Sequence, residues 1–562
     1  MSTSSWDTLI TDALVFDGSG GPPQNLDPRL PEVVRHGTTT VLVGNCSLGT
    51  CFGQQLEGEQ NPIVDCFTRV ENIPKKVLSK CVENITWDNT GDYMAHFDTL
   101  ALGPNIGAFV PHSMLRVEVM GLKDSISRDP TEPELREMER LLEQAMTQGY
   151  LGMSTDGLPF HYLANAPHTD QRIPTQFASH DRVWQTTPII ENRVKGLLYF
   201  FLSSGRLFGG RPLKTSALSV MKFVLAPKAS NAFLGVAGLV NSALLKGRIH
   251  FQALGTNFRI WADGIVSPIF EELDSTCKLI AKEYDDVEGR RALLNDPAFV
   301  EEFRRDWFHG RKGRNLATFK AKMGLPDKVV IRDPELMIFD GAPVPEWDGE
   351  SMQQVFERLQ RFQRGQSGEA RSEAEREALA AFPNPTADDA DFMLHLLREY
   401  DKSFRWYVDV GNTDKEATLG YLLHRNALPG FNDSGAHITN MAFFDANLMS
   451  LKLAQAEGME TVARMVKRLT RDPAEFFGLD VGSLEIGAQA DITLVDPEVL
   501  KGWDSNEHRA FIHRELFDHK QMVNRSDGVV THVLINGEPV WQQGEFTEVL
   551  GSRSLGRALR AA

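Results

Sequence analysis

The chain has 562 residues, of which 42% are hydrophobic and 24% charged, and its 59 basic residues are outnumbered by 76 acidic ones. The net charge of −17 argues against binding to nucleic acid or anionic membranes, because basic residues that neutralise phosphates supply most of that affinity. Five cysteines are an odd number in a long chain, which indicates free thiols in a reducing compartment. No apolar run reaches the about 18 residues of a membrane span, and the N-terminus carries no secretion signal, so we expect a cytoplasmic protein.

The two ends of the chain share one pattern. Residues 8–17, 487–496 and 529–538 are short apolar or alternating runs that end in turn residues, as strands do. Val540 and Trp541 continue the last run beyond Asn536-Gly537, which predicts a hairpin. We therefore expect one small β-domain that both termini build, from residues 1–23 and 479–562.

The middle of the chain alternates strands with helices. Apolar runs occur at 39–44, 105–110 and 150–154, with weaker candidates at 183–186, 213–216, 249–252 and 428–432. Between them, Thr131-Glu-Pro-Glu134 is a capping-box pattern that predicts a helix ending at Gly149. So many βα units favour an α/β fold with a (β/α)8 barrel, formed by residues 24–284 and 401–478.

Residues 285–400 differ from both of these patterns. Apolar residues at helical spacing, such as those between Met352 and Phe362, alternate with the polar stretch 364–377. The region is too long for a barrel loop. It is therefore predicted to be an inserted, mainly helical subdomain.

Reactive groups of a parallel barrel lie at the C-terminal ends of its strands, and two such ends carry candidate metal ligands. Cys46 follows the 39–44 run; its thiolate could hold zinc or another divalent metal, or it could be a small buried cysteine. Asp433 follows the last run and could bind a metal, or take a proton from water and pass it to a leaving amine, with His437 supporting it by a hydrogen bond. Alternatively, Asp433 and Ser434 form a turn with their own backbone.

A third strand end carries His112 and Arg116. Arg116 could bind a carboxylate in the fork geometry of a guanidinium, or the two could be a structural histidine and a surface arginine. The 15 histidines include no His-x-His and no His-x-x-x-His pair, and we interpret His161 and His168 as loop residues. No short motif therefore supplies two imidazoles to one metal.

Taken together, the sequence resembles the N-acyl-D-amino-acid deacylases (D-aminoacylases), a branch of the amidohydrolase superfamily. The resemblance runs in family order through residues 10–23, 35–46, 105–116, 119–121, 152–155, 432–437 and 487–496. It implies a metal-bearing barrel beside the small β-domain, and hydrolysis of the amide bond of a small N-acyl amino acid or a related amide. It also implies that Cys46 binds zinc and that Asp433 is the acid/base near the metal, so that Asp433 is expected to serve both as ligand and as catalyst. We expect His112, Arg116 and His437 to contact the substrate.

The sequence departs from the family pattern at its metal ligands. Family members carry a His-x-His at the end of the first barrel strand, whereas here Pro23 runs directly into Gln24, so that strand and its histidines are expected to be missing. Thr186 and Ser216 stand where later histidine ligands are expected. Cys46 and Asp433 alone are too few for a zinc site, since catalytic zinc has three protein ligands. The site is therefore expected to be incomplete.

Two functional hypotheses remain open at this point. One is an amidohydrolase that cleaves C–N bonds with a metal-activated water and an aspartate acid/base. The other is a non-catalytic or truncated family member that keeps the scaffold. A barrel without its first strand would leave two open sheet edges, which predicts aggregation or a homo-oligomer.

Overall fold

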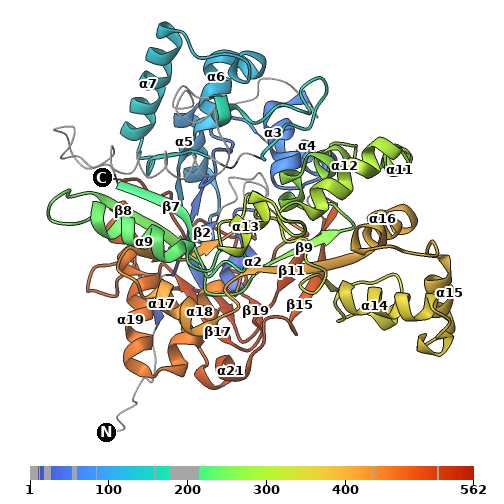
Figure 1. The fold of residues 1–562 in the computed structure, drawn as a ribbon. Helices are drawn as coiled ribbons and strands as arrows, with labels where there is room; N and C mark the ends of the chain where they lie inside the picture. The colour runs from blue at the N-terminus through green and yellow to red at the C-terminus, as the bar shows by residue number, and fades with distance from the viewer. Residues whose placement is uncertain are drawn as a thin grey trace.

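A computed structural model describes residues 10–11, 13–17, 27–52, 60–83, 85–156, 158, 160–177, 214–434, 437–515 and 518–561, with backbone only for those before residue 27. Parallel strands form its centre, and three groups of neighbours define their order (Figure 1). The first group is β7 (Lys214–Val220), β8 (Arg248–Ala253) and β12 (Ala427–Pro429). The second is β13 (Phe431–Asn432), β2 (Ala13–Asp17), β3 (Thr38–Val43) and β4 (Asn105–Ala108). The third is β5 (Val110–Pro111) and β6 (Met153–Ser154).

These strands confirm the expected α/β class. All the pairs are parallel, and β3 is buried along its whole length, as a strand covered on both faces must be. β12 and β13 are consecutive in the chain, separated by Gly430 at φ 108°, so they join the first two groups. The strand expected at 183–186 lies outside the described residues.

A strand from the N-terminal region, β2, lies inside the parallel sheet. It lies between β13 and β3, with Phe16 opposite Phe431 and Leu14 opposite Thr40. Residues 1–23 were expected to belong to the small β-domain; among those that the structure describes, β1 (Ile10–Thr11) pairs there, with β14 (Ile492–Val495), whereas β2 does not. Both edges of β2 are hydrogen-bonded to neighbours. The absence of the first barrel strand with its His-x-His stays a prediction.

Helices follow the strands as the alternating pattern predicts. In the first half of the chain these are α2 (Pro31–Arg35), α3 (Pro62–Val70), α4 (Lys75–Val82), α5 (Thr90–Thr99), α6 (His112–Ser125), α7 (Glu132–Thr147) and α9 (Ala229–Val240). Near the end they are α17 (Lys415–Leu422), α18 (Ala446–Ala456), α19 (Met459–Leu469) and α20 (Arg471–Phe477). The predicted capping box begins α7, where the Glu134 carboxylate accepts a hydrogen bond from the Thr131 amide at 2.7 Å.

A mainly helical region lies between β8 and β12 and extends to one side of the strands in Figure 1. Its helices are α10 (Asp274–Ile280), α11 (Val287–Leu294), α12 (Pro297–Phe308), α13 (Leu316–Lys322), α14 (Met352–Gln363), α15 (Glu373–Ala381) and α16 (Asp389–Tyr400). An antiparallel sheet of β9 (Phe258–Asp263), β11 (Arg405–Gly411) and β10 (Ile338–Phe339) packs with them. Its core runs from Ala262 to Val408, so residues on both sides of the expected range 285–400 share it.

The C-terminal region is a second antiparallel sheet and a separate hairpin. The sheet has the order β1, β14, β17 (Val530–Ile535), β18 (Glu538–Gln542) and β19 (Glu545–Phe546). Asn536 and Gly537, both at positive φ, make the predicted turn between β17 and β18. β15 (Arg509–Arg514) and β16 (His519–Asn524) form the hairpin, and α21 (Pro497–Gly502) precedes it. Among the described helices, none is long and apolar enough to cross a membrane.

Candidate functional site

The ends of β3 and β13 bring two predicted site residues to the same edge of the sheet. Both strands run parallel to β2, one on each side of it, so their C-terminal ends point the same way. Cys46 follows β3 by three residues, and Asp433 follows β13 directly. The Cys46 thiol interacts electrostatically with the Asp433 carboxylate, and also with Asp156 and Glu71. We call the region around Cys46, Glu71, Asp156 and Asp433 the mouth.

Cys46 lies in an environment that favours the protonated thiol. Burial raises its pKa well above the ordinary value, and the neighbouring carboxylates of Asp156, Glu71 and Asp433 raise it further. Its backbone carbonyl accepts a hydrogen bond from the Ser154 hydroxyl at 2.5 Å, which ties the end of β3 to the end of β6.

Asp433 lies beside His437, which the sequence predicted to support it by a hydrogen bond. The imidazole Nε2 of His437 is 3.6 Å from Asp433 Oδ2 and 3.2 Å from Glu71 Oε2, and its Nδ1 donates to the Glu71 backbone carbonyl at 3.2 Å. Burial raises the pKa of Asp433, opposed by the charges of His437 and His161. Burial also lowers the pKa of His437, which favours the neutral imidazole.

The turn that the sequence offered as an alternative at Asp433 is made by its neighbour. The Asn432 side-chain oxygen accepts a hydrogen bond from the Ser434 amide at 2.8 Å, an Asx turn. Asn432 also donates to the carbonyl of Phe443 at 2.9 Å. Asn432 therefore fixes the loop, and the Asp433 carboxyl remains the group that faces His437.

Three residues of the mouth were missed by sequence reasoning: Glu71, Asp156 and His161. His161, which we interpreted as a loop residue, is buried and its Nδ1 donates to Asp156 Oδ2 at 2.5 Å. Burial lowers the pKa of His161, but the carboxylates of Asp156, Glu271 and Asp433 outweigh it, and the net shift is upward. Asp156 could have been found as the first carboxylate after the 150–154 run, whereas nothing in the sequence distinguishes Glu71 from other acidic residues that follow a helix.

Behind the mouth, a buried ion pair connects α3 to the helical region. The Arg69 guanidinium donates to both carboxylate oxygens of Glu271, at 2.8 and 2.5 Å, and both side chains are nearly inaccessible. Glu271 lies in the 3-10 helix η4 (Pro268–Glu272). Arg69 also donates to the backbone carbonyls of Leu163 and Thr169, which lie in the loop that carries His161.

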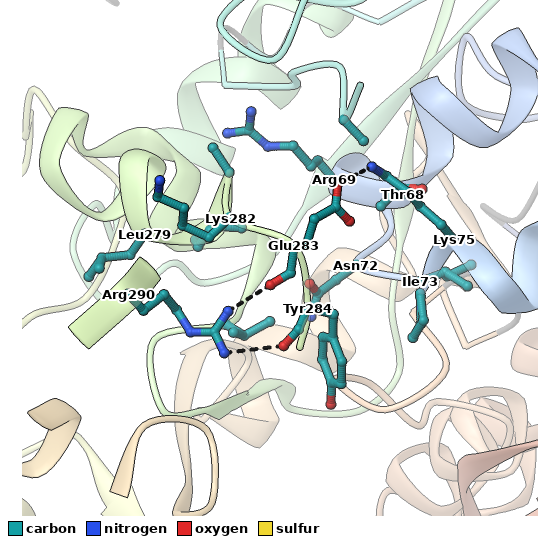
Figure 2. A pocket seen from close by; sticks show the side chains of 15 residues that line it. Thr68, Arg69, Asn72, Ile73, Lys75, Leu279, Lys282, Glu283, Tyr284 and Arg290 are labelled. Atoms are coloured by element: carbon teal, nitrogen blue, oxygen red, sulfur yellow. Dashed lines mark hydrogen bonds and ion pairs between the residues drawn. The ribbon is translucent and has the colours of Figure 1, made fainter. Parts of the chain in front are cut away.

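Next to Arg69 is a small cavity of about 60 Å³, whose lining Figure 2 shows. Two of its cationic side chains have acidic or carbonyl partners: Lys75 binds Glu283 at 2.5 Å, and Arg290 donates to the carbonyls of Glu283 and Tyr284. This volume holds a few water molecules at most. The cavity is therefore too small for an N-acyl amino acid.

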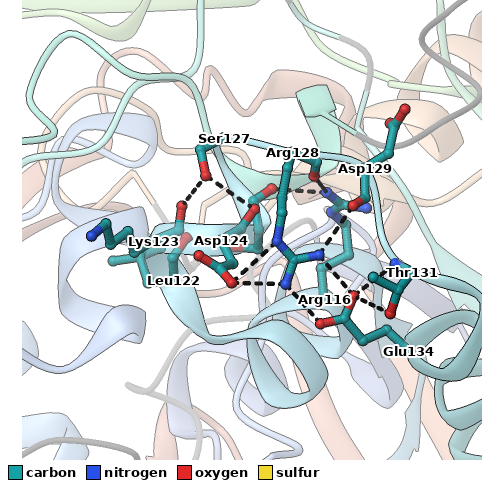
Figure 3. Close-up of polar contacts among 10 residues, drawn as sticks. Arg116, Leu122, Lys123, Asp124, Ser127, Arg128, Asp129, Thr131 and Glu134 are labelled. Atoms are coloured by element: carbon teal, nitrogen blue, oxygen red, sulfur yellow. Dashed lines mark hydrogen bonds and ion pairs between the residues drawn. The ribbon is translucent and has the colours of Figure 1, made fainter.

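The structure separates the two residues predicted to contact substrate at the third strand end. His112 lies at the mouth, because its Nδ1 is 3.1 Å from the hydroxyl of Thr155, the residue before Asp156. Arg116 is buried, and its guanidinium donates to the carbonyls of Ser125 at 2.8 Å and Arg128 at 3.5 Å, in the corner between α6 and α7 (Figure 3). These two bonds anchor the Arg116 guanidinium in this corner.

Ser216, where the resemblance implied a metal ligand, is part of a network of side-chain amides. Asn45 and Gln252 exchange two side-chain hydrogen bonds, at 2.9 and 3.1 Å, and Gln252 Nε2 also donates to the Ser216 hydroxyl at 3.0 Å. Asn45 follows β3, Gln252 lies near the end of β8, and Ser216 lies in the first half of β7. They are neutral donors and acceptors that satisfy one another.

The described part of the chain does not fit a closed metal site. In it, no group of three or more His, Cys, Asp or Glu side chains is arranged to hold an ion. The amide network around Ser216 agrees with this, because its members are neutral groups that bond one another. Thr186, the other position of an expected ligand, lies outside the described residues. We therefore derive no chemical step through a metal.

The chain is similar to known proteins at three levels. Residues 428–540 match the model of the amidohydrolase family. Uncharacterized proteins of Mycobacterium tuberculosis and Mycobacterium bovis are 31% identical over 548 residues, which cover 93% of this chain and 81% of theirs. A D-aminoacylase crystal structure superposes with a TM-score of 0.52 at 15% identity, over 98% of this chain and 88% of that one. A second structure, from a study of the binuclear metal centre of D-aminoacylase, gives 0.51 at 16% identity over the same shares.

Proposed function

Because the chain belongs to the amidohydrolase superfamily and has the fold of its D-aminoacylase branch, we propose that it hydrolyses the amide C–N bond of a small N-acyl amino acid or a related amide. The observation that carries the proposal is the placement of Asp433 at the mouth, beside His437 and within the electrostatic reach of His161. In a (β/α)8 barrel this edge is where reactive groups gather.

Asp433 is the proposed acid/base. A carboxyl whose pKa is raised by burial is suited to exchange protons near neutral pH. As the oxygen of a water molecule bonds to the carbonyl carbon, Asp433 takes a proton from that water. It then gives the proton to the amide nitrogen as the C–N bond breaks, which releases an amine and a carboxylic acid. His437, fixed by Glu71, orients the carboxyl.

A second candidate function has its own support. The Asn45–Gln252–Ser216 network and the few metal donors of the described residues favour a family member that keeps the scaffold without turnover. Zinc held by Cys46 and Asp433 stays an expectation of the resemblance. A residue outside the described ranges would have to complete that site.

The test is a hydrolysis assay, which measures amine release from N-acetyl-D-amino acids and their L-enantiomers and carboxylate formation by ring opening of cyclic ureides, with the metal content of the same sample measured. We expect amine release by the wild type, and a loss of about 10²- to 10⁴-fold in kcat for Asp433→Asn. Asp480→Asn, an exposed aspartate, is the matched control with unchanged rate. Absence of turnover on every substrate would favour the non-catalytic candidate, and full activity of Asp433→Asn would exclude the proposed role of that residue.

A further inference from the structure

Resting on the proposed function, we propose that His161, oriented by Asp156, is a further catalytic residue, which donates a hydrogen bond from Nε2 to the carbonyl oxygen of the bound amide. Nothing in the sequence patterns assigned a role to either residue. The two side chains lie at the mouth, and their geometry fixes which ring nitrogen is presented.

Asp156 is anchored at the edge where the reactive groups gather. It follows β6 by two residues, and the Ser154 hydroxyl before it bonds the carbonyl of Cys46. One carboxylate oxygen of Asp156 accepts from the Leu158 amide at 2.8 Å, and the other accepts from His161 Nδ1 at 2.5 Å. The carboxylate thus holds the ring by Nδ1, and Nε2 is the ring nitrogen that remains to bind a substrate. No hydrogen bond to Nε2 is recorded within the described ranges.

The loop that carries His161 is held in place by buried polar contacts. The Asp65 carboxylate accepts from the amides of Ala164 and Asn165, both at 2.7 Å. Arg69 binds the carbonyl of Leu163 on one side and Glu271 on the other. A donor fixed in this way does not have to reorganise as charge develops on the substrate, which is the condition for strong electrostatic catalysis.

The charges around His161 support the same role. The groups that interact with it are the carboxylates of Asp156, Glu271 and Asp433, together with His437. Burial lowers the pKa of His161, but the carboxylates raise it more, so the net shift favours the doubly protonated ring. The pKa of His437 is shifted downward instead. The environments of the two imidazoles push their pKa values apart, as happens where groups have different roles in proton transfer.

In the proposed reaction, His161 stabilises the negative charge that develops on the carbonyl oxygen. When the water oxygen attacks, the electron pair of the C=O bond moves to the carbonyl oxygen, where the Nε2–H of His161 stabilises it. The pair returns to re-form the C=O bond as the C–N bond breaks, and Asp433 supplies the proton to nitrogen. His161 keeps its proton throughout.

The test compares His161→Gln and Asp156→Asn with His168→Gln, a matched control in the same loop that lies outside the mouth. Loss of one oxyanion donor costs about 10²- to 10³-fold in kcat, and we expect this for His161→Gln with little change in KM. Asp156→Asn should lower kcat less and move the alkaline limb of the pH profile to lower pH, because a neutral amide stabilises the imidazolium less. His168→Gln should keep the wild-type rate.

A wild-type kcat and pH profile for His161→Gln would overturn the inference and leave the proposed function intact. Absence of turnover by the wild type would instead count against the proposed function. A second measurement then tests His161 by itself: ¹⁵N NMR of the histidine rings, assigned with His161→Gln. We expect the His161 ring to titrate at a higher pH than a free imidazole, and a midpoint at or below that of a free imidazole would overturn the inference without any assay of activity.

Discussion

Replacing Arg69 by methionine should lower the free energy of unfolding by about 3–5 kcal/mol. The reason lies in the burial of its partner: the side chains of Arg69 and Glu271 are only 3% and 2% exposed. The substitution removes two charge-assisted hydrogen bonds to Glu271 and leaves its carboxylate without the charge that compensates its burial. Burial already raises the pKa of Glu271, with Arg69 opposing the shift, so without Arg69 the carboxyl takes up a proton more readily.

Urea unfolding curves at pH 7 and pH 5 measure this effect. The loss should be smaller at pH 5, where Glu271 is protonated in the variant. Arg69→Met combined with Glu271→Leu should recover most of the stability, because no unpaired charge is then buried. Lys75→Met is the control: its partner Glu283 is 68% exposed, so the expected loss is below about 1 kcal/mol. A loss for Arg69→Met no larger than for Lys75→Met would refute the reasoning.

Three other expectations concern stability and can be measured by the same unfolding curves. Gly37→Ala should cost about 2–4 kcal/mol, because Gly37 has φ +82° and an added Cβ would lie 2.4 Å from Thr493 Cγ2. Thr131→Ala should cost about 1 kcal/mol by removing half of the capping box of α7, and Thr131→Ser should restore it. Burial raises the pKa of Asp445 to about 6, so the folded state keeps a proton that the unfolded chain releases near pH 4. As the pH rises from about 4 to about 6, the free energy of unfolding should therefore decrease by up to about 3 kcal/mol. Asp445→Asn should remove this dependence on pH.

Each of these three has an outcome that contradicts it. Gly349→Ala has a similar φ of +79° but open space around the added Cβ, so an equal loss at both glycines would show that the contact with Thr493 is unimportant. Unchanged stability of Thr131→Ala would show that the capping box contributes nothing. If the free energy of unfolding of Asp445→Asn still depends on pH in this range, other carboxyl groups cause the dependence.

The parts of the fold that were predictable are those that local physics determines. The buried β-branched run at Thr38–Val43 and the capping box at Thr131 depend on neighbouring residues only, and both are present as expected. The approach of Cys46 and Asp433 follows from the rule that parallel strands share one reactive edge.

The parts that were missed depend on contacts between distant segments. The run Ala13–Asp17 reads equally well as a strand of either sheet, and only its pairing with Phe431 and Thr38 decides which. The bonds of Arg116 to carbonyls in the α6–α7 corner could not be predicted from the sequence. His161 lies in a loop, as expected, but its bond to Asp156 could not be predicted, because Asp156 follows a strand of only two residues.

The position of β2 limits the order in which the nascent protein can mature. β3 leaves the ribosome shortly after β2, whereas β13, on the other side of β2, is made only near the end of translation. At a translation rate of about 5–20 residues per second, the ribosome makes β13 roughly 20–80 s after β3. During that interval one edge of β2 has no native partner and can pair wrongly, so the emerging chain depends on delayed collapse or on chaperones to reach its final topology.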